Sequence, residues 1–133
     1  MNEAEFQSIL ARGEDSRHQF KRDETNADSI AAELAAFANS GGGLLLLGVD
    51  DNGKVTGLDA VNVRRLNQLI SNAASQNFFF NDTATTENIQ TAQGIVIAVN
   101  VPNGLSKPYL DSQGRIWVKS GSDKRHVTAR EEI

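Results

Sequence analysis

The sequence contains no cysteine and no long apolar run. Without cysteine there is no disulfide framework, no thiolate zinc site and no thiol nucleophile. No stretch approaches the roughly 18 consecutive apolar residues of a membrane-spanning helix. The acidic N-terminal segment with Phe6 and Ile9 does not resemble a secretory signal. We therefore expect a cytoplasmic protein that does not enter membranes, in which residues 1–133 form a single domain with one hydrophobic core.

Several catalytic and nucleotide-binding motifs are also missing. The glycines Gly41–Gly43 follow a predicted helix and precede a predicted strand, without an adjacent lysine. A P-loop has the opposite order, strand then glycine-rich loop then helix, and ends in Lys-Ser or Lys-Thr. No G-x-G-x-x-G follows a strand and no G-x-S-x-G is present. The two histidines, His18 and His126, lack the spacing of metal ligands. These absences disfavour nucleotide hydrolysis, dinucleotide binding and serine hydrolysis.

The distribution of charge is more informative than its sum. The net charge of −4 argues against nucleic-acid binding, because phosphate contacts need lysine and arginine. However, residues 1–87 hold seven basic and thirteen acidic side chains, whereas residues 104–133 hold six basic and four acidic ones. The segment from Arg115 to Arg130 contains five basic residues and a single acidic one, Asp123. This segment is either a solvated loop beside an edge strand or a phosphate-binding surface.

Apolar periodicity and glycine stops predict an α+β fold with a mixed β-sheet and packed helices. The block from Ala36 to Leu58 is the clearest part. It contains the end of a helix, a glycine stop, an apolar strand at 44–49 that should be buried on both faces, and a turn. Two hairpins are expected, one around Asp50–Gly53 with its return strand at 54–56 and one around Asp111–Gly114 with strands at 109–110 and 115–119. The remaining predicted elements are helices at 3–12, 26–38 and 61–74 and strands at 18–22 and 95–101.

Two segments need separate treatment. Thr128–Glu131 has the residues of a capping box, which begins a helix, yet the sequence ends at Ile133. We expect the chain to be the N-terminal domain of a longer protein. Residues 78–87 begin with three phenylalanines and continue as a Thr-rich loop, and the phenylalanines suit a buried strand or an aromatic patch for stacking bases. Asn81–Glu87 also equals the translation of a common sequencing adapter, so the functional argument rests on residues outside this segment.

Three stretches together resemble the Schlafen-type AlbA domain, a family of nucleic-acid-binding modules in prokaryotic regulators and Schlafen proteins. They are Gly13–Lys21, Ala36–Leu58 and Arg115–Ser122. The resemblance implies an AlbA-like α+β fold. In its nucleolytic members, three acids form a metal-dependent RNA-cutting site: a glutamate, a second acid five residues later in Glu-Phe-Lys, and a third after the central strand. Glu14 and Asp51 match the first and third acids, and Gln19 stands in place of the second.

The residues themselves permit two interpretations of these acids. Glu14, Asp50 and Asp51 stand at the ends of strands predicted to be neighbours, and clustered carboxylates can hold a divalent ion that activates water. Alternatively, Asp50 and Asp51 are simply favoured in a turn. An amide at position 19 removes one anionic ligand, which lowers the expected affinity for Mg²⁺ or Mn²⁺. The departure therefore favours binding over cleavage.

We expect a nucleic-acid-binding module, for DNA or RNA, of a transcriptional regulator or helicase-like protein. The alternatives are a divalent-metal endoribonuclease that uses Glu14 and Asp51 as metal ligands and catalytic residues, and a protein-interaction or homo-oligomerisation domain. Trp117 is expected in the core rather than as a stacking platform. The predicted phosphate contacts are Lys21, Arg22, Lys119, Lys124, Arg125 and Arg130.

Overall fold

The computed structural model describes residues 1–23, 26–77, 84–104, 107–111 and 113–127. Within these residues, none of the helices has the length and apolar character needed to cross a membrane. The elements in chain order are α1 (Glu3–Arg12), β1 (His18–Lys21), α2 (Ala27–Asn39), β2 (Gly42–Leu47), α3 (Ala60–Asn77), β3 (Thr85–Thr91), β4 (Gly94–Pro102), β5 (Ile116–Ser120) and β6 (Asp123–Val127).

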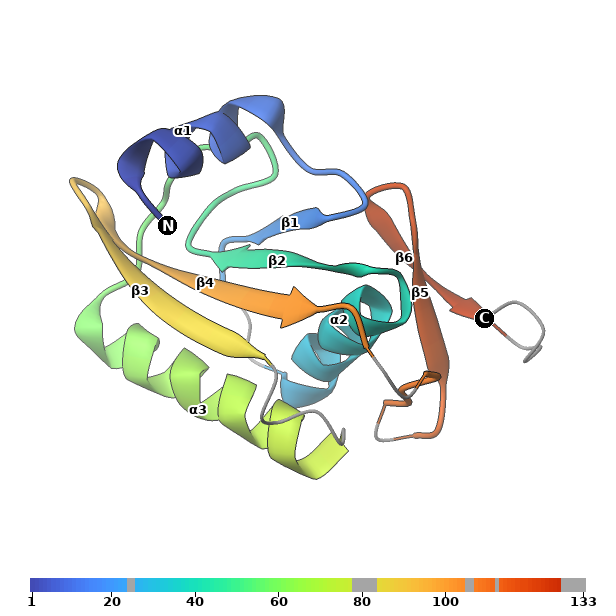
Figure 1. The fold of residues 1–133 in the computed structure, drawn as a ribbon. Coiled ribbons are helices and arrows are strands. Elements are labelled where there is room, and N and C mark those ends of the chain that lie inside the picture. Colours follow the sequence, from blue (N-terminus) through green and yellow to red (C-terminus); the bar gives the residue numbers. More distant parts are fainter. Residues whose placement is uncertain (24–25, 78–83, 105–106, 112, 128–133) are drawn as a thin grey trace.

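Four strands form a sheet in the order β1-β2-β4-β3, and β5 and β6 form a separate two-stranded hairpin (Figure 1). β1 runs parallel to β2, whereas β2 pairs antiparallel with β4, and β4 with β3. The sheet is therefore mixed, which confirms the α+β class predicted from the sequence.

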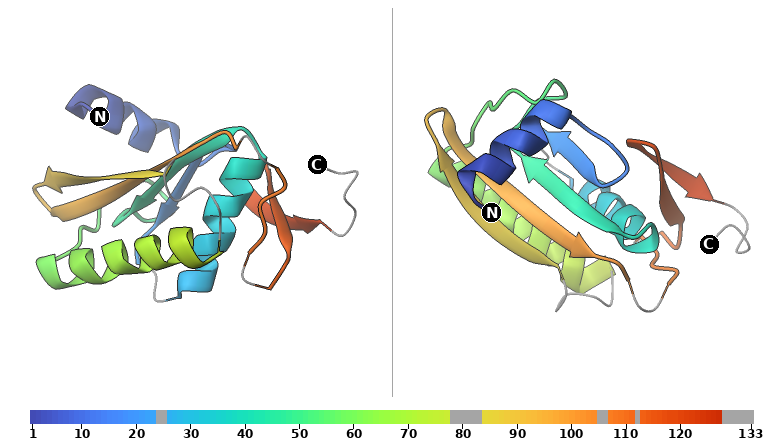
Figure 2. Two further views of the ribbon diagram at one scale, coloured as in Figure 1. Left: turned by 60° about the horizontal axis from the view of Figure 1, so that its bottom comes forward. Right: turned by 45° about the horizontal axis from the view of Figure 1, so that its top comes forward.

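Helices lie on both faces of the sheet: α2 and α3 on one face and α1 on the other (Figure 2). Side chains of a strand alternate between faces. Accordingly Leu45 and Leu47 pack with α2 and α3, while Leu46 packs with Phe6 of α1 and its neighbours. Val49 joins the cluster of Leu46 because the alternation ends with β2 at Leu47, before Gly48, which has a φ of 100°. The apolar run at 44–49 is thus covered on both faces, as predicted. Gly43 is needed for the approach of α2, because a Cβ atom there would collide with the ring of Phe37.

The strand predicted at 54–56 is wrong as a regular element. The turn itself forms, since Gly53 N donates to Asp50 O at 3.0 Å and Asp50 N donates to Lys54 O at 2.9 Å. Beyond it, an isolated bridge joins Val49 to Val55, and Thr56 N and Gly57 N both donate to Gly48 O, but these contacts do not make a regular strand. The physical reason is that β1 and β4 already occupy the two sides of β2. The chain leaves this position and Leu58 bridges to Ile95 instead.

The second predicted hairpin is also reduced to a bridge, between Leu110 and Ile116, and β5 pairs along its full length with β6. Neither β6 nor the edge strand β3 is predicted from the sequence, and the Thr-rich loop expected within residues 78–87 overlaps the N-terminal part of β3. Both strands are largely exposed. They pair with their neighbours through backbone hydrogen bonds, and because they are exposed their sequences need no alternation of apolar and polar residues. That alternation is the pattern from which a strand is predicted.

Asn39, at the C-terminal end of α2, fixes the β5–β6 hairpin and the loop before it. Its side chain is buried, and Nδ2 donates to Tyr109 O at 3.0 Å and to Trp117 O at 2.8 Å. Oδ1 accepts from Tyr109 N at 2.8 Å. The next residue, Ser40, accepts from Lys119 N at 2.9 Å through Oγ. One amide therefore satisfies three backbone groups, which would be costly to bury without partners.

Asp111 organises the loop that leads into β5. Its Oδ2 accepts from Trp117 Nε1 at 2.9 Å and from Arg115 Nε at 2.7 Å, and its Oδ1 accepts from the backbone N–H of Gln113 and Arg115, both at 2.9 Å. Burial raises the pKa of Asp111, but the hydrogen bonds from Trp117, Arg115 and Gln113 together outweigh it and hold the pKa below 3.8. The carboxylate form is therefore stabilised by folding.

Replacing Asn39 by alanine is expected to lower the free energy of unfolding by about 3 kcal/mol, because three buried backbone groups lose their partner. Urea denaturation measures this loss. Asn100, exposed on β4, is the matched control, and its alanine variant should stay within about 0.5 kcal/mol of the parent. A loss of unfolding free energy below about 1 kcal/mol for Asn39→Ala would contradict the role of Asn39 in holding the hairpin.

Asp111→Asn is expected to destabilise the protein by about 1–2 kcal/mol at neutral pH. Because the folded pKa of Asp111 lies below 3.8, its contribution is complete above that pH and is lost as the pH falls through the folded value. The difference in unfolding free energy between parent and variant should therefore shrink between pH 5 and pH 3. Equal differences at pH 7, 5 and 3 would show that the charge of Asp111 is not responsible.

Candidate nucleic-acid interface

Glu14 lies beside β1 because the chain turns back after α1. An isolated bridge joins Asp15 to His18, and Asp15 N donates to His18 O at 3.0 Å. Glu14 Oε1 then accepts from Phe20 N at 2.8 Å and from Gln19 Nε2 at 2.9 Å. The first two positions of the family pattern are thus neighbours in space. Glu14 also satisfies a backbone N–H of the edge strand β1, which is a structural role.

Gln19 joins Glu14 to Lys119, which the sequence predicts only as a phosphate contact. Its Oε1 accepts a hydrogen bond from Lys119 Nζ at 3.0 Å, across 100 positions of sequence. The same ammonium donates to Ser122 O at 2.8 Å and lies 4.9 Å from the centroid of the Phe37 ring. Gln19 therefore bridges a carboxylate on one side and an ammonium on the other, and Lys119 is held by contacts from three elements.

Lys119 is half-buried on β5. Burial lowers the pKa of its ammonium, and the negative charges of Glu33 and Glu14 partly oppose this effect. Lys124 adds to the lowering, while Asp123 opposes it. Lys119 is thus influenced by charged groups from α2, from the segment before β1 and from the hairpin.

A polar pocket of about 430 Å³ opens between β1, α2 and the turn of the hairpin. It is lined by Gln19, Lys21, Glu33, Ser122, Asp123 and Lys124. Glu33 is buried, with 3% of its surface exposed, and its Oε1 accepts from Lys124 Nζ at 3.0 Å. The other carboxylate oxygen of Glu33 has no hydrogen-bond partner among the residues that the structure describes. Glu33 therefore depends on Lys124 for compensation of its charge.

Trp117 is half-buried rather than in the core, and cationic side chains surround its ring. The guanidinium carbon of Arg115 and the Nζ of Lys124 lie 5.4 and 5.6 Å from the ring centroid. The ring of His126 lies 5.6 Å away, tilted by 43°. Since Asp111 binds the indole N–H, the ring is fixed in place. Trp117 thus anchors the basic side chains of the hairpin.

The remaining predicted contacts are placed as follows. Lys21 lines the polar pocket, Arg22 is exposed directly after β1, and Arg125 is exposed on β6. Arg130 falls outside the residues that the structure describes. The structure thus brings Lys21 and Lys124, from two distant parts of the sequence, to one pocket.

The acids predicted to hold a metal ion are arranged differently. Asp50 Oδ1 accepts from Asn52 N and Lys54 N, both at 2.9 Å, so Asp50 stabilises the turn. Asp51 is exposed in that turn. Across the described part of the chain there is no group of three or more histidine, aspartate or glutamate side chains placed to hold a metal ion. The amide of Gln19, already bonded to Glu14 and Lys119, does not fit as a replacement ligand.

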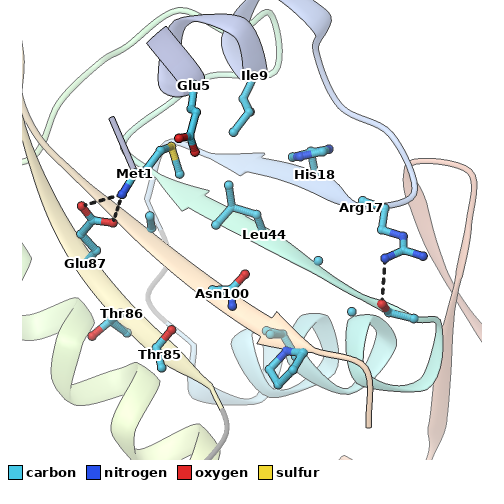
Figure 3. A pocket seen from close by; sticks show the side chains of 16 residues that line it. Met1, Glu5, Ile9, Arg17, His18, Leu44, Thr85, Thr86, Glu87 and Asn100 are labelled. Carbon is cyan, nitrogen blue, oxygen red and sulfur yellow. Dashed lines mark hydrogen bonds and ion pairs between the residues drawn. The ribbon is translucent and has the colours of Figure 1, made fainter. Parts of the chain in front are cut away.

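A larger hollow, of about 720 Å³, lies on the sheet face that α1 covers only in part (Figure 3). One cross-strand row contributes His18, Leu44, Asn100 and Thr85 to it. Arg17 stands at one end, where its Nη1 donates to Gly41 O at 2.9 Å. Of the predicted site residues within the described ranges, none lines this hollow.

The family model "Schlafen, AlbA_2" matches residues 14–128. The chain belongs to this family. The structure of the Schlafen AlbA_2 domain is also similar to that of the DIP2311 protein from Corynebacterium diphtheriae, with a TM-score of 0.66 and 24% sequence identity. The match covers 93% of this chain and 26% of that one, so the chain spans about a quarter of the length of its structural relative. No curated protein matches the sequence.

Replacing Lys124 by methionine is expected to lower the free energy of unfolding by about 2–3 kcal/mol, because the buried carboxylate of Glu33 loses its counter-charge. The double variant Glu33→Met with Lys124→Met should recover most of this loss, since apolar side chains of similar volume then fill the site. Chemical denaturation of the two single variants and the double variant tests the coupling. Additive effects would show that the pair is not coupled.

Proposed function

We propose that this Schlafen AlbA_2 domain binds nucleic acid through the polar pocket and its basic rim. The observation that carries the proposal is the docking of the basic hairpin against β1, through the hydrogen bond between Lys119 and Gln19, and against α2, through the ion pair between Lys124 and Glu33. Membership of a family associated with nucleic-acid binding supports the same conclusion.

The chemistry of the surface suits a phosphate backbone rather than a particular base sequence. Lys21 and Lys124 line the pocket, and Arg22 and Arg125 are exposed beside them in sequence. Lysine and arginine that neutralise phosphates release condensed counterions, which makes affinity salt-dependent and largely independent of sequence. The acidic remainder of the domain then limits contact to this surface, because it repels the polyanion elsewhere.

The proposal assigns different roles to the cations. Lys119 and Lys124 are committed to contacts within the protein, so they shape the surface and set its local potential. Arg22 and Arg125 are exposed and follow Lys21 and Lys124 in the sequence, and we assign to them the phosphate contacts at the rim of the pocket. A test that reverses Lys119 or Lys124 would remove contacts that hold the hairpin, so the exposed positions Arg22 and Arg125 are reversed instead, with thermal unfolding as the check on folding.

Reversing both rim arginines, Arg22→Glu with Arg125→Glu, is expected to weaken binding at least tenfold. For duplex DNA the slope of log affinity against log salt concentration should fall by about two, since each lost phosphate contact removes about 0.9. Fluorescence anisotropy with labelled single- and double-stranded oligonucleotides at several salt concentrations measures both quantities. The reduction should be similar for unrelated sequences.

The matched control is Arg64→Glu with Lys107→Glu, which changes the net charge equally at two exposed positions outside the pocket. It should weaken binding less than threefold. Equal losses in the two double variants would show a general charge effect, and unchanged binding after reversal of Arg22 and Arg125 would remove the proposed surface.

A further inference from the structure

Glu14, Gln19 and Lys119 are linked by two hydrogen bonds at the place where the family pattern has two of its acids. Gln19 Nε2 donates to Glu14 Oε1 at 2.9 Å, and Gln19 Oε1 accepts from Lys119 Nζ at 3.0 Å. The two partners fix the orientation of the amide, because the flipped amide would direct its NH₂ group at an ammonium. The N–H side of Gln19 therefore faces the carboxylate, and its oxygen faces the positive charge.

This arrangement opposes a divalent cation on two grounds. Mg²⁺ and Mn²⁺ bind oxygen ligands, preferably anionic ones. Here the only oxygen of the Gln19 side chain already accepts from Lys119, and its nitrogen offers hydrogens rather than a lone pair. In addition, the ammonium of Lys119 carries a positive charge within hydrogen-bond distance of that oxygen, so a bound cation would be repelled.

We propose that the Lys119 ammonium takes the place of a divalent cation beside Glu14 and Gln19, so that this surface attracts phosphodiester groups without a metal. The second half of the statement rests on the proposed function. The first half concerns only the three side chains and holds whether or not a nucleic acid binds.

The position of Lys119 supports this role. Its ammonium is held by Ser122 O at 2.8 Å, by Gln19 and by the face of the Phe37 ring, and its backbone N–H donates to Ser40. A charge fixed by three contacts, on a backbone that is itself anchored, keeps its position when a ligand arrives, as a coordinated ion would. A mobile lysine would lose side-chain entropy on binding instead.

A cycle of variants tests the exclusion of metal. We expect no Mn²⁺ binding at 1 mM by calorimetry for the parent, for Gln19→Glu or for Lys119→Met. In Gln19→Glu the new carboxylate is paired with Lys119, and in Lys119→Met the side chain beside Glu14 at position 19 is still an uncharged amide. The double variant Gln19→Glu with Lys119→Met places two carboxylates side by side without the ammonium that is bonded to position 19. It should bind Mn²⁺ at least tenfold more tightly than either single variant.

The matched control is Gln19→Glu with Lys107→Met, which has the same net charge as the double variant but keeps Lys119. It should not bind Mn²⁺. Binding by the parent, by Gln19→Glu alone or by this control would overturn the proposal, and so would a folded double variant that gains no affinity. Thermal unfolding shows whether the double variant folds.

The second measurement needs only the parent protein. Anisotropy titrations with a labelled oligonucleotide in 1 mM EDTA and in 1 mM MnCl₂, at equal ionic strength, should give Kd values within twofold. Loss of oligonucleotide binding in EDTA would overturn the proposal that the surface binds phosphodiester groups without a metal. If no oligonucleotide binds under either condition while the Mn²⁺ cycle behaves as expected, the proposed function fails and the replacement of the cation by Lys119 stands.

Discussion

The site depends on how the β5–β6 hairpin docks at the C-terminal end of α2. Two-stranded hairpins are marginally stable alone, so this one requires a partner surface. Asn39 supplies it by bonding the backbone of Tyr109 and Trp117 from a buried position, and Ser40 extends the contact to Lys119. These are backbone contacts, which fix the register of the hairpin independently of its side chains. Lys119 and Lys124 then reach β1 and α2, and the pocket exists only as a result.

The predictable part of the fold is the part that alternation and periodicity describe. The apolar run at 44–49, the small residues of α2 and the glycine stop between them specify a covered strand and a closely packed helix. β3 and β6 could not be predicted in the same way, because their residues are mostly exposed and pair through the backbone. The strand expected at 54–56 shows the converse limit, since local turn chemistry was sufficient for the turn but competition for the sides of β2 decided the pairing.

The candidate site divides along the same line. The proximity of Glu14 and Gln19 follows from a turn five residues long, and the family pattern predicts it. The partners of Gln19 and Glu33 lie 100 and 91 positions away, at Lys119 and Lys124, and no local pattern connects them. Glu33 was predictable as part of a helix but not as a buried charge, because its burial comes from the docked hairpin. Basic residues in a charged run are usually solvated, and only tertiary structure distinguishes the rim arginines from the lysines that bind the protein.

Position 19 shows why a change of one residue cannot be interpreted without its partners. Compared with the family pattern alone, Gln19 appears only as the loss of a metal ligand, because an amide lacks the negative charge of the acid. Between Glu14 and Lys119 the amide is instead the residue type that matches both neighbours, since it offers a donor to the carboxylate and an acceptor to the ammonium. A glutamate there would face Glu14 with like charge and would have to be neutralised by Lys119 alone. The substitution and the lysine thus form one arrangement, in which the protein provides its own cation and the carboxylate of Glu14 is left to hold the edge of the sheet.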